Sequence, residues 1–249
     1  MNYMLLAYSP ESAWTREEWL ACTVASGRIC DELRAKGCFL AAAPLEPVAT
    51  AASVRVRAGE TLVTAGPFAE TVEQLGGFFL IDVPSLDEAI ALAARLPSAA
   101  KGTIEIRPVH ALAGVPEARF DAPSPPGTAR YMLLCYDDEA AWAAAGATAL
   151  DEAQAEAAAL TQQLARRGQH VAASPLHPVA TATSVRIREG RRLVSDGPFA
   201  ETTEVLGGYY LIDARDLNDA IAVAARHPGA RLRTVEVRRV VDLAALANA

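Results

Sequence analysis

The sequence predicts an α+β fold that occurs twice in tandem. Three observations lead to this prediction: a long internal repeat, a proline-rich segment between its copies, and an alternation of strand-like and helix-like patterns within each copy. The motif LVTAGPFAET at 62–71 returns as LVSDGPFAET at 193–202. Over residues 39–108, about three positions in five match the residue at the corresponding later position, which is far more than chance allows. The chain is therefore a duplication of one domain.

The two copies are expected at 1–113 and 129–249, joined by a linker at 114–128. Four prolines and two glycines in this linker exclude helix and sheet there and favour an extended connection. The second copy has gained three residues around 143–147, just before its first helix.

Each copy begins with a strand-like pattern followed by a helix-like one. In the first copy we expect a strand over 3–8 and a helix over 15–36, which opens with a capping-box sequence and ends before a glycine. In the second copy Thr148 is expected to cap the matching helix over 148–167.

The remaining pattern predicts a hairpin, a strand, a helix and a closing strand. Residues 53–57 alternate valine and arginine, so we expect a half-exposed outer strand with its arginines in solvent, turning into a partner strand over 61–64. An apolar run over 77–82 predicts a strand that is buried on both faces. A helix that starts at Ser85 and an alternating strand over 103–107 complete the copy. This order predicts a ferredoxin-like sheet with helices on one face.

At this point the motifs resemble a known family. The DGPFAET motif at 196–202, followed by LGGYYLID at 206–213, is similar to the DGPF branch of the YCII-related proteins, and the similarity covers both copies. This resemblance implies a dimeric α+β barrel, in which two ferredoxin-like sheets pack together. The two copies could form it as an intrachain pseudo-dimer, or each copy could pair with its equivalent in a second molecule of a homodimer.

Composition narrows the function classes. The chain is 51% hydrophobic and 21% charged, with a net charge of −7, and neither copy is basic, so we do not expect nucleic-acid binding. It shows no membrane-spanning stretch and no secretion signal, which favours a cytoplasmic protein. The four cysteines lack metal-site spacing, and no phosphate-binding loop or nucleophile elbow occurs. We therefore expect no metal and no cofactor.

The Gly-Pro-Phe turns are the strongest candidate site. Acidic residues cluster there, and two nearby carboxylates can share a proton and so serve acid–base catalysis. The candidate catalytic residues are Asp196, Glu201 and Glu204. The candidate ligand-binding residues are Gly66, Pro67, Phe68, Glu70, Gly197, Pro198, Phe199 and Asp213. The alternative is that these residues only form and cap turns. The first copy has Ala65 in place of Asp196, so the two sites are expected to differ.

The resemblance also implies a possible enzyme, because many members of the family carry a histidine and an aspartate. Here the first helices lack histidine, and none of the four histidines, His110, His170, His177 and His227, recurs at the matching position of the other copy. We expect a protein that binds an unidentified small molecule, with carboxylate-based acid–base chemistry as its enzymatic form. The alternative is a regulatory or interaction module, since DGPF proteins are often encoded beside extracytoplasmic-function sigma factors. A site predicts an enclosed cleft lined by Asp196 and Glu201, with at least one of the two carboxylates desolvated. An interaction module predicts solvated carboxylates and a flat exposed apolar patch.

Overall fold

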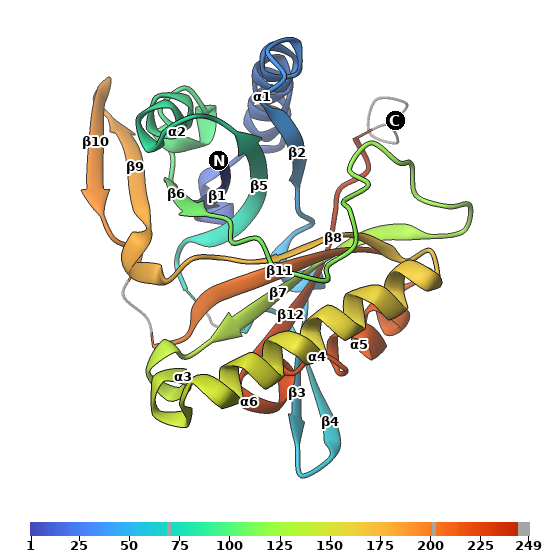
Figure 1. The fold of residues 1–249 in the computed structure, drawn as a ribbon. Coiled ribbons are helices and arrows are strands. Elements are labelled where there is room, and N and C mark those ends of the chain that lie inside the picture. The colour runs from blue at the N-terminus through green and yellow to red at the C-terminus, as the bar shows by residue number, and fades with distance from the viewer. Residues whose placement is uncertain (69–70, 201–202, 244–249) are drawn as a thin grey trace. The chain divides into compact units, whose positions relative to one another are not determined.

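The computed structural model describes residues 1–68, 71–200 and 203–243, which form two compact units. The first unit comprises Met1–Ala42, Glu70–Ala111 and Pro175–Gly207, and the second comprises Ala43–Ala69, Leu112–Ser174 and Gly208–Ala249. Each unit therefore combines segments from both repeats (Figure 1).

The sheet of the first unit has the ferredoxin-like strand order. Its own repeat supplies β1 (Asn2–Ser9), β2 (Phe39–Pro44), β5 (Gln74–Asp82) and β6 (Thr103–Pro108), ordered β6-β1-β5-β2. The connections carry α1 (Arg16–Ala35), α2 (Leu86–Ala93) and the short 3₁₀ helices η1 (Glu11–Ala13) and η3 (Pro97–Ala100), and the second repeat adds the 3₁₀ helix η4 (Val179–Thr181). Beyond β6 lies a hairpin from the second repeat, β9 (Thr183–Arg188) and β10 (Arg191–Asp196).

The second unit repeats this plan. Its strands β7 (Ala129–Asp137), β8 (His170–Pro175), β11 (Val205–Ala214) and β12 (Thr234–Arg239) are ordered β12-β7-β11-β8. Its helices are α3 (Glu139–Ala145), α4 (Ala147–Arg166), α5 (Leu217–Ala224) and α6 (Gly229–Leu232), and the first repeat adds the 3₁₀ helix η2 (Val48–Thr50). The first repeat supplies the hairpin beyond β12, β3 (Ala52–Arg57) and β4 (Glu60–Ala65). The expected α+β class with two ferredoxin-like domains is confirmed.

We call β3–β4 and β9–β10 the exchanged hairpins, and β6 and β12 the closing strands. In Figure 1 the orange β9–β10 hairpin lies beside the green β6, and the cyan β3–β4 hairpin lies beside the red β12. The pairing is antiparallel and equivalent in the two sheets, with Ile104 opposite Val185 and Val235 opposite Val54. Each repeat therefore completes the sheet of the other.

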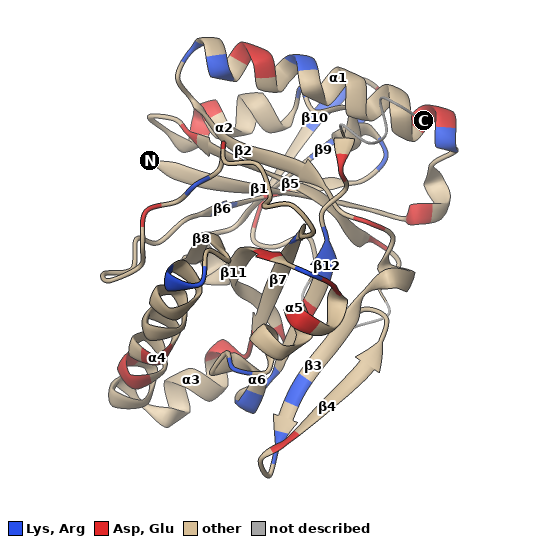
Figure 2. Ribbon diagram, turned by 90° about the vertical axis from the view of Figure 1, so that its right-hand side faces the viewer, with Lys and Arg blue, Asp and Glu red and all other residues tan. Residues whose placement is uncertain are grey.

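The exchange corrects the expectation that the arginine-rich strands lie outermost, although Arg55 and Arg57 of β3 are exposed as expected and Arg186 and Arg188 of β9 are half-buried. Strand β9 lies between β10 and β6, and β3 lies between β4 and β12. Arg188 donates to the carbonyl oxygens of Ala99 and Gly102, and Arg57 donates to the matching carbonyls at the end of α6. Both guanidinium groups bind the last carbonyls of a helical turn, which a cation stabilises. Figure 2 shows the basic positions of β3 in blue.

The first helices of the two repeats begin differently. In α1 the predicted capping box is confirmed, because Thr15 and Glu18 satisfy each other's backbone N–H groups. In the second repeat the prediction that Thr148 caps the helix is wrong. There Asp138 caps the additional helix α3, and α4 begins directly after Gly146, which leaves Thr148 inside the helix. Gly146 has φ +88°, a conformation that glycine adopts without strain.

Each sheet buries alternate side chains under its helices. In the first unit Leu5, Ile104 and Ile106 pack with Ile29 and Leu33 of α1 in one apolar core. The intervening residues of the closing strand point to the opposite face, and they are the polar residues Thr103, Glu105 and Arg107. They are buried as well, so this polar sheet face is where a site is to be sought. Among the described residues, no helix is long and apolar enough to cross a membrane.

Candidate functional site

Each closing strand carries a buried pair of opposite charges. Glu105 and Arg107 are 3% and 1% exposed, and Glu236 and Arg238 are 2% and 1% exposed. In each pair one Nη1 donates to one carboxylate oxygen, at 3.3 Å in the first unit and 3.2 Å in the second. Removing such charges from water is costly unless both partners are paired and hydrogen-bonded. Each pair therefore has a free-energy cost of burial, and the fold nevertheless contains such a pair in both units.

In each pair, the second carboxylate oxygen accepts a hydrogen bond from a Gly-Pro-Phe turn that belongs to the other repeat. The backbone N–H of Phe199 donates to Glu105 Oε2 at 3.0 Å, and that of Phe68 donates to Glu236 Oε2 at 3.0 Å. The Phe199 ring stacks on Tyr8 with 3.8 Å between ring centroids. The Phe68 ring stacks in the same way on Tyr136, at 3.6 Å. A carboxylate, a guanidinium and an aromatic stack thus meet at the same place in both units.

Glycine is needed at the start of each turn. Gly197 has φ +94° and Gly66 has φ +95°, in the left-handed region that side chains disfavour. The N–H of Gly197 donates to Ala182 at 2.8 Å, and its carbonyl accepts from the Ser184 hydroxyl at 2.9 Å. The following proline restricts the chain further, so the turn presents the phenylalanine N–H to the carboxylate in one fixed conformation.

A polar relay lies beside the Glu105–Arg107 pair. The hydroxyl of Thr103 donates to Glu73 Oε2 at 3.0 Å and accepts from Arg186 Nε at 2.6 Å. The same sheet face therefore presents two carboxylates, those of Glu73 and Glu105, and two guanidinium groups, those of Arg107 and Arg186, near the Tyr8–Phe199 stack. Such a set could orient a small polar molecule and exchange a proton with it.

The two pairs differ in one donor. Arg107 donates through Nη2 to the carbonyl of His177 at 2.5 Å, and its Nε has no hydrogen-bond partner among the residues that the structure describes. In the second unit Arg238 Nε donates to the carbonyl of Glu46 at 3.2 Å. The first unit thus keeps a buried donor for an oxygen atom of a ligand or a water molecule.

The structure separates the predicted residues into distinct groups. Gly197, Pro198 and Phe199 lie with Glu105, and Gly66, Pro67 and Phe68 lie with Glu236. Asp196 is exposed at the end of β10, and Glu204 is half-buried just before β11. Glu70 and Glu201 lie outside the described residues.

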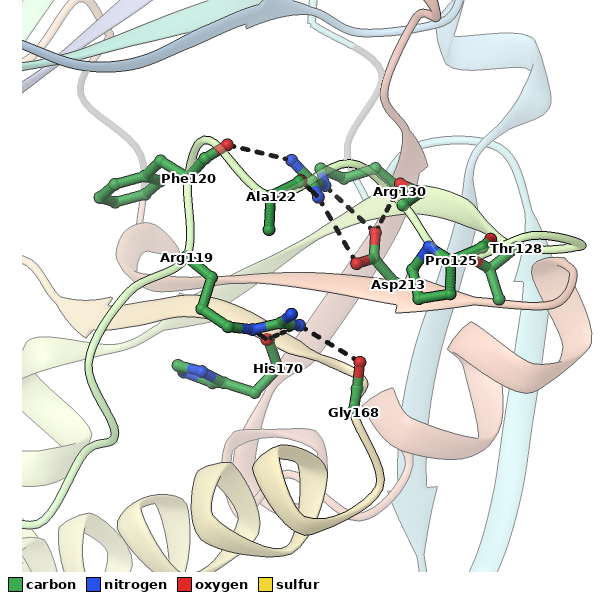
Figure 3. Close-up of polar contacts among 10 residues, drawn as sticks. Arg119, Phe120, Ala122, Pro125, Thr128, Arg130, Gly168, His170 and Asp213 are labelled. Carbon is green, nitrogen blue, oxygen red and sulfur yellow. Dashed lines mark hydrogen bonds and ion pairs between the residues drawn. The ribbon is translucent and has the colours of Figure 1, made fainter.

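Asp213 contacts the linker. Its carboxylate is buried and accepts from the Ser124 hydroxyl at 2.7 Å. It also accepts from Arg130 Nε at 3.2 Å (Figure 3). Nearby, the Arg119 guanidinium donates to the carbonyl oxygens of His170 and Gly168, and the Arg119 N–H donates to Val171 of β8. These contacts fasten the linker to the second unit.

A buried cysteine and histidine also meet in the second unit. His227 Nε2 lies 3.7 Å from Cys135 Sγ, and His227 Nδ1 accepts the N–H of Gly229 at 3.1 Å. This contact assigns the ring proton to Nε2, so the neutral ring has no lone pair for the thiol proton. Burial raises the pKa of Cys135 well above its usual value and lowers the pKa of His227 to about 4. The pair is therefore unsuited to nucleophilic catalysis. The described residues contain no group of three histidine, cysteine, aspartate or glutamate side chains that could hold a metal ion.

Sequence reasoning missed the residues at the centre of both sites. Glu105, Arg107 and Tyr8 were not singled out, because an alternating strand suggests a half-exposed face. A signal was nevertheless present: a glutamate and an arginine two residues apart recur at the same positions of both closing strands.

Comparisons with known proteins agree with the repeat. The model of the YCII-related domain matches residues 1–113 and 129–244. An uncharacterized protein of Rhizobium meliloti (strain 1021) is 43% identical over 121 residues, which cover 44% of this chain and 92% of that protein. A crystal structure provisionally described as a chlorite dismutase aligns with 99% of this chain and 97% of its own, at 10% identity and a TM-score of 0.40. A likeness this weak does not bear on function.

Proposed function

Because the chain belongs to the YCII-related domain family, we propose that it is a small-molecule-binding protein whose ligand lies against the polar sheet face at the Gly-Pro-Phe turns. The observation that carries this proposal is the desolvated carboxylate of Glu105 or Glu236, paired with an arginine and set beside an aromatic stack. Ionisable side chains that are buried outside the apolar core are concentrated at functional sites.

The enzymatic form of this proposal assigns acid–base chemistry to these carboxylates. A carboxylate has about four acceptor positions, and Glu105 uses one on Arg107 and one on Phe199. The remaining positions could accept a proton from a ligand or a hydrogen bond from its hydroxyl group. Glu201 and Glu204 follow the second turn along the chain, and we retain them with Asp196 as further candidate carboxylates.

A regulatory module associated with sigma factors is the alternative. That hypothesis predicts solvated carboxylates and an exposed apolar patch, and the exposed Asp196, Leu193 and Val194 of β10 favour it. The binding proposal depends instead on Glu105 and Glu236, which are buried. The exchange of hairpins also supports a pseudo-dimer within one chain, because each turn meets its glutamate without a second molecule.

The test is a ligand screen with matched variants. A library of small carboxylic acids, phenols and amides is screened by thermal shift, and hits are measured by ligand-observed NMR. We expect hits to lose binding in the Glu105→Gln/Glu236→Gln double variant and to keep it in Glu60→Gln, which changes an exposed residue of β4. Each single variant shows which unit binds.

The glutamine variants keep an acceptor for the phenylalanine N–H, and circular dichroism verifies that they fold. Hits that bind equally to the folded double variant would exclude these glutamates as the site. A further pair, Asp196→Ala and Glu201→Ala, tests the additional carboxylates in the same assay.

A further inference from the structure

Strand β10 forms a free edge of the first unit's sheet. Among the described residues it pairs with β9 alone, and all six of its residues are exposed, with Leu193 at 50% and Val194 at 46%. An exposed edge strand with adjacent apolar residues presents unpaired backbone groups and is a template for another strand.

The phase of the hairpin determines which backbone groups face this edge. Arg188 and Arg191 flank a two-residue turn and are opposite each other, which makes them a hydrogen-bonded pair. At the other end, the N–H of Gly197 donates to Ala182, in the same phase. Because the pattern alternates, the outward N–H and C=O groups belong to Arg192, Val194 and Asp196.

We infer that a second copy of this chain pairs with β10 in antiparallel register about a twofold axis at Val194. In a symmetric antiparallel pair, residues that are opposite each other have their side chains on the same side of the sheet. Arg192, Val194 and Asp196 meet this requirement, because side chains two residues apart in a strand point to the same side. Val194 then lies opposite Val194 of the partner subunit, and Arg192 lies opposite Asp196 of the partner subunit. The symmetry repeats the ion pair at the other end.

Charge complementarity distinguishes β10 from the equivalent edge of the second unit. Strand β4 is also fully exposed, with Leu62 at 48% and Val63 at 49%, so apolar exposure alone does not separate the two edges. The positions of Arg192 and Asp196 are occupied in β4 by Thr61 and Ala65. Both members of the cross-strand ion pair are present in β10 and both are absent from β4. Opposite charges facing each other stabilise strand pairing.

The experiment measures self-association of the full chain by sedimentation velocity over a wide range of protein concentration. We expect a monomer–dimer equilibrium. Asp196→Arg should weaken the dimer about tenfold or more, because two attractive cross-strand pairs become repulsive. The swap Arg192→Asp/Asp196→Arg should restore it. Val194→Pro should abolish it, since proline removes an outward N–H and leaves the bonds to β9 in place.

The matched controls lie on β4. Val63→Pro and Ala65→Arg should leave the dimer unchanged, and a thermal unfolding curve of each variant verifies the fold. A chain that stays monomeric at every concentration overturns the inference. A dimer that survives Val194→Pro, or that Val63→Pro removes equally, overturns the β10 interface. Failure of the charge swap to restore association overturns the register.

Discussion

Glu105 shows how one side chain can serve structure and chemistry together. Its first oxygen neutralises Arg107, and its second fixes the backbone of the exchanged Gly-Pro-Phe turn. Substitution by alanine would leave a buried guanidinium unpaired, which typically costs about 3–5 kcal/mol. Glutamine has a similar shape and keeps one acceptor, its carbonyl oxygen, for the N–H of Phe199, while its NH2 group replaces the oxygen that accepts from Arg107. For this reason the ligand experiment relies on glutamine, so that loss of binding can be separated from loss of fold.

His227 makes the stability of the second unit dependent on pH. Burial lowers the pKa of His227 from 6.5 to about 4, so the folded protein keeps the ring neutral where the unfolded chain protonates it. As the pH falls from 6.5 to about 4, the unfolded state takes up a proton that the folded state refuses. We expect the free energy of unfolding to drop by about 3 kcal/mol over this window from this group.

The measurement is urea unfolding at neutral pH and near pH 4.5 for the wild type and His227→Leu. The first repeat has Leu96 at this position, so leucine fits the fold. The variant should lose less stability on acidification than the wild type, whereas His110→Leu, at an exposed position, should behave like the wild type. An acid-induced loss in His227→Leu as large as that of the wild type would contradict the assignment.

At the scale of elements, the two first helices make an internal comparison of capping. Thr15 accepts the N–H of Glu18 at the start of α1, whereas Thr148 lies within α4. We expect Thr15→Ala to lower the free energy of unfolding by about 1 kcal/mol and Thr148→Ala to change it by a few tenths at most. Chemical denaturation of both variants tests this expectation. Equal losses would show that Thr148 has a capping role after all.

The sequence contained enough information for most of the elements, but not for strand β2, helix α3 or the exchange of the hairpins. Strands and helices follow from local periodicity, caps and turns, and the hairpin over 53–64 is confirmed as β3–β4. The partner of that hairpin could not be predicted. The segments Ile104–Ile106 and Val235–Val237 have nearly the same side chains, so either closing strand offers the same pairing surface. The choice depends on chain connectivity, which no local pattern encodes.

The candidate site was predicted in part for a related reason. Glycine and proline identified the turns at 66–68 and 197–199, because their backbone preferences are local. Their acceptors, Glu105 and Glu236, belong to strands far away in the sequence, and only the exchanged pairing brings them together. The aspartate of the motif drew attention first, yet it lies at the exposed end of β10.

At the scale of the whole molecule, the exchange means that neither repeat can complete its sheet alone. The closing strand β6 pairs with β9 of the second repeat, and β12 pairs with β3 of the first. In addition, Ser124 and Arg130 bind Asp213 at the linker, and Arg119 binds the carbonyl of His170 (Figure 3). The linker is therefore attached to the second repeat, and the two exchanged hairpins connect the repeats in addition to the covalent chain.

This predicts that the repeats stay associated after the linker is cut. A protease site inserted at Gly127, beyond the contacts of Arg119 and Ser124, allows cleavage of the folded protein between the repeats. We expect the two fragments to co-elute in native size-exclusion chromatography and to separate only in denaturant, because dissociation requires both exchanged hairpins to leave their sheets. Hydrogen exchange of β9 and β3 should remain slow in the cut protein, since their ladders persist. Fragments that separate in native buffer, or rapid exchange in both hairpins, would show that the exchanged pairing does not hold the repeats together.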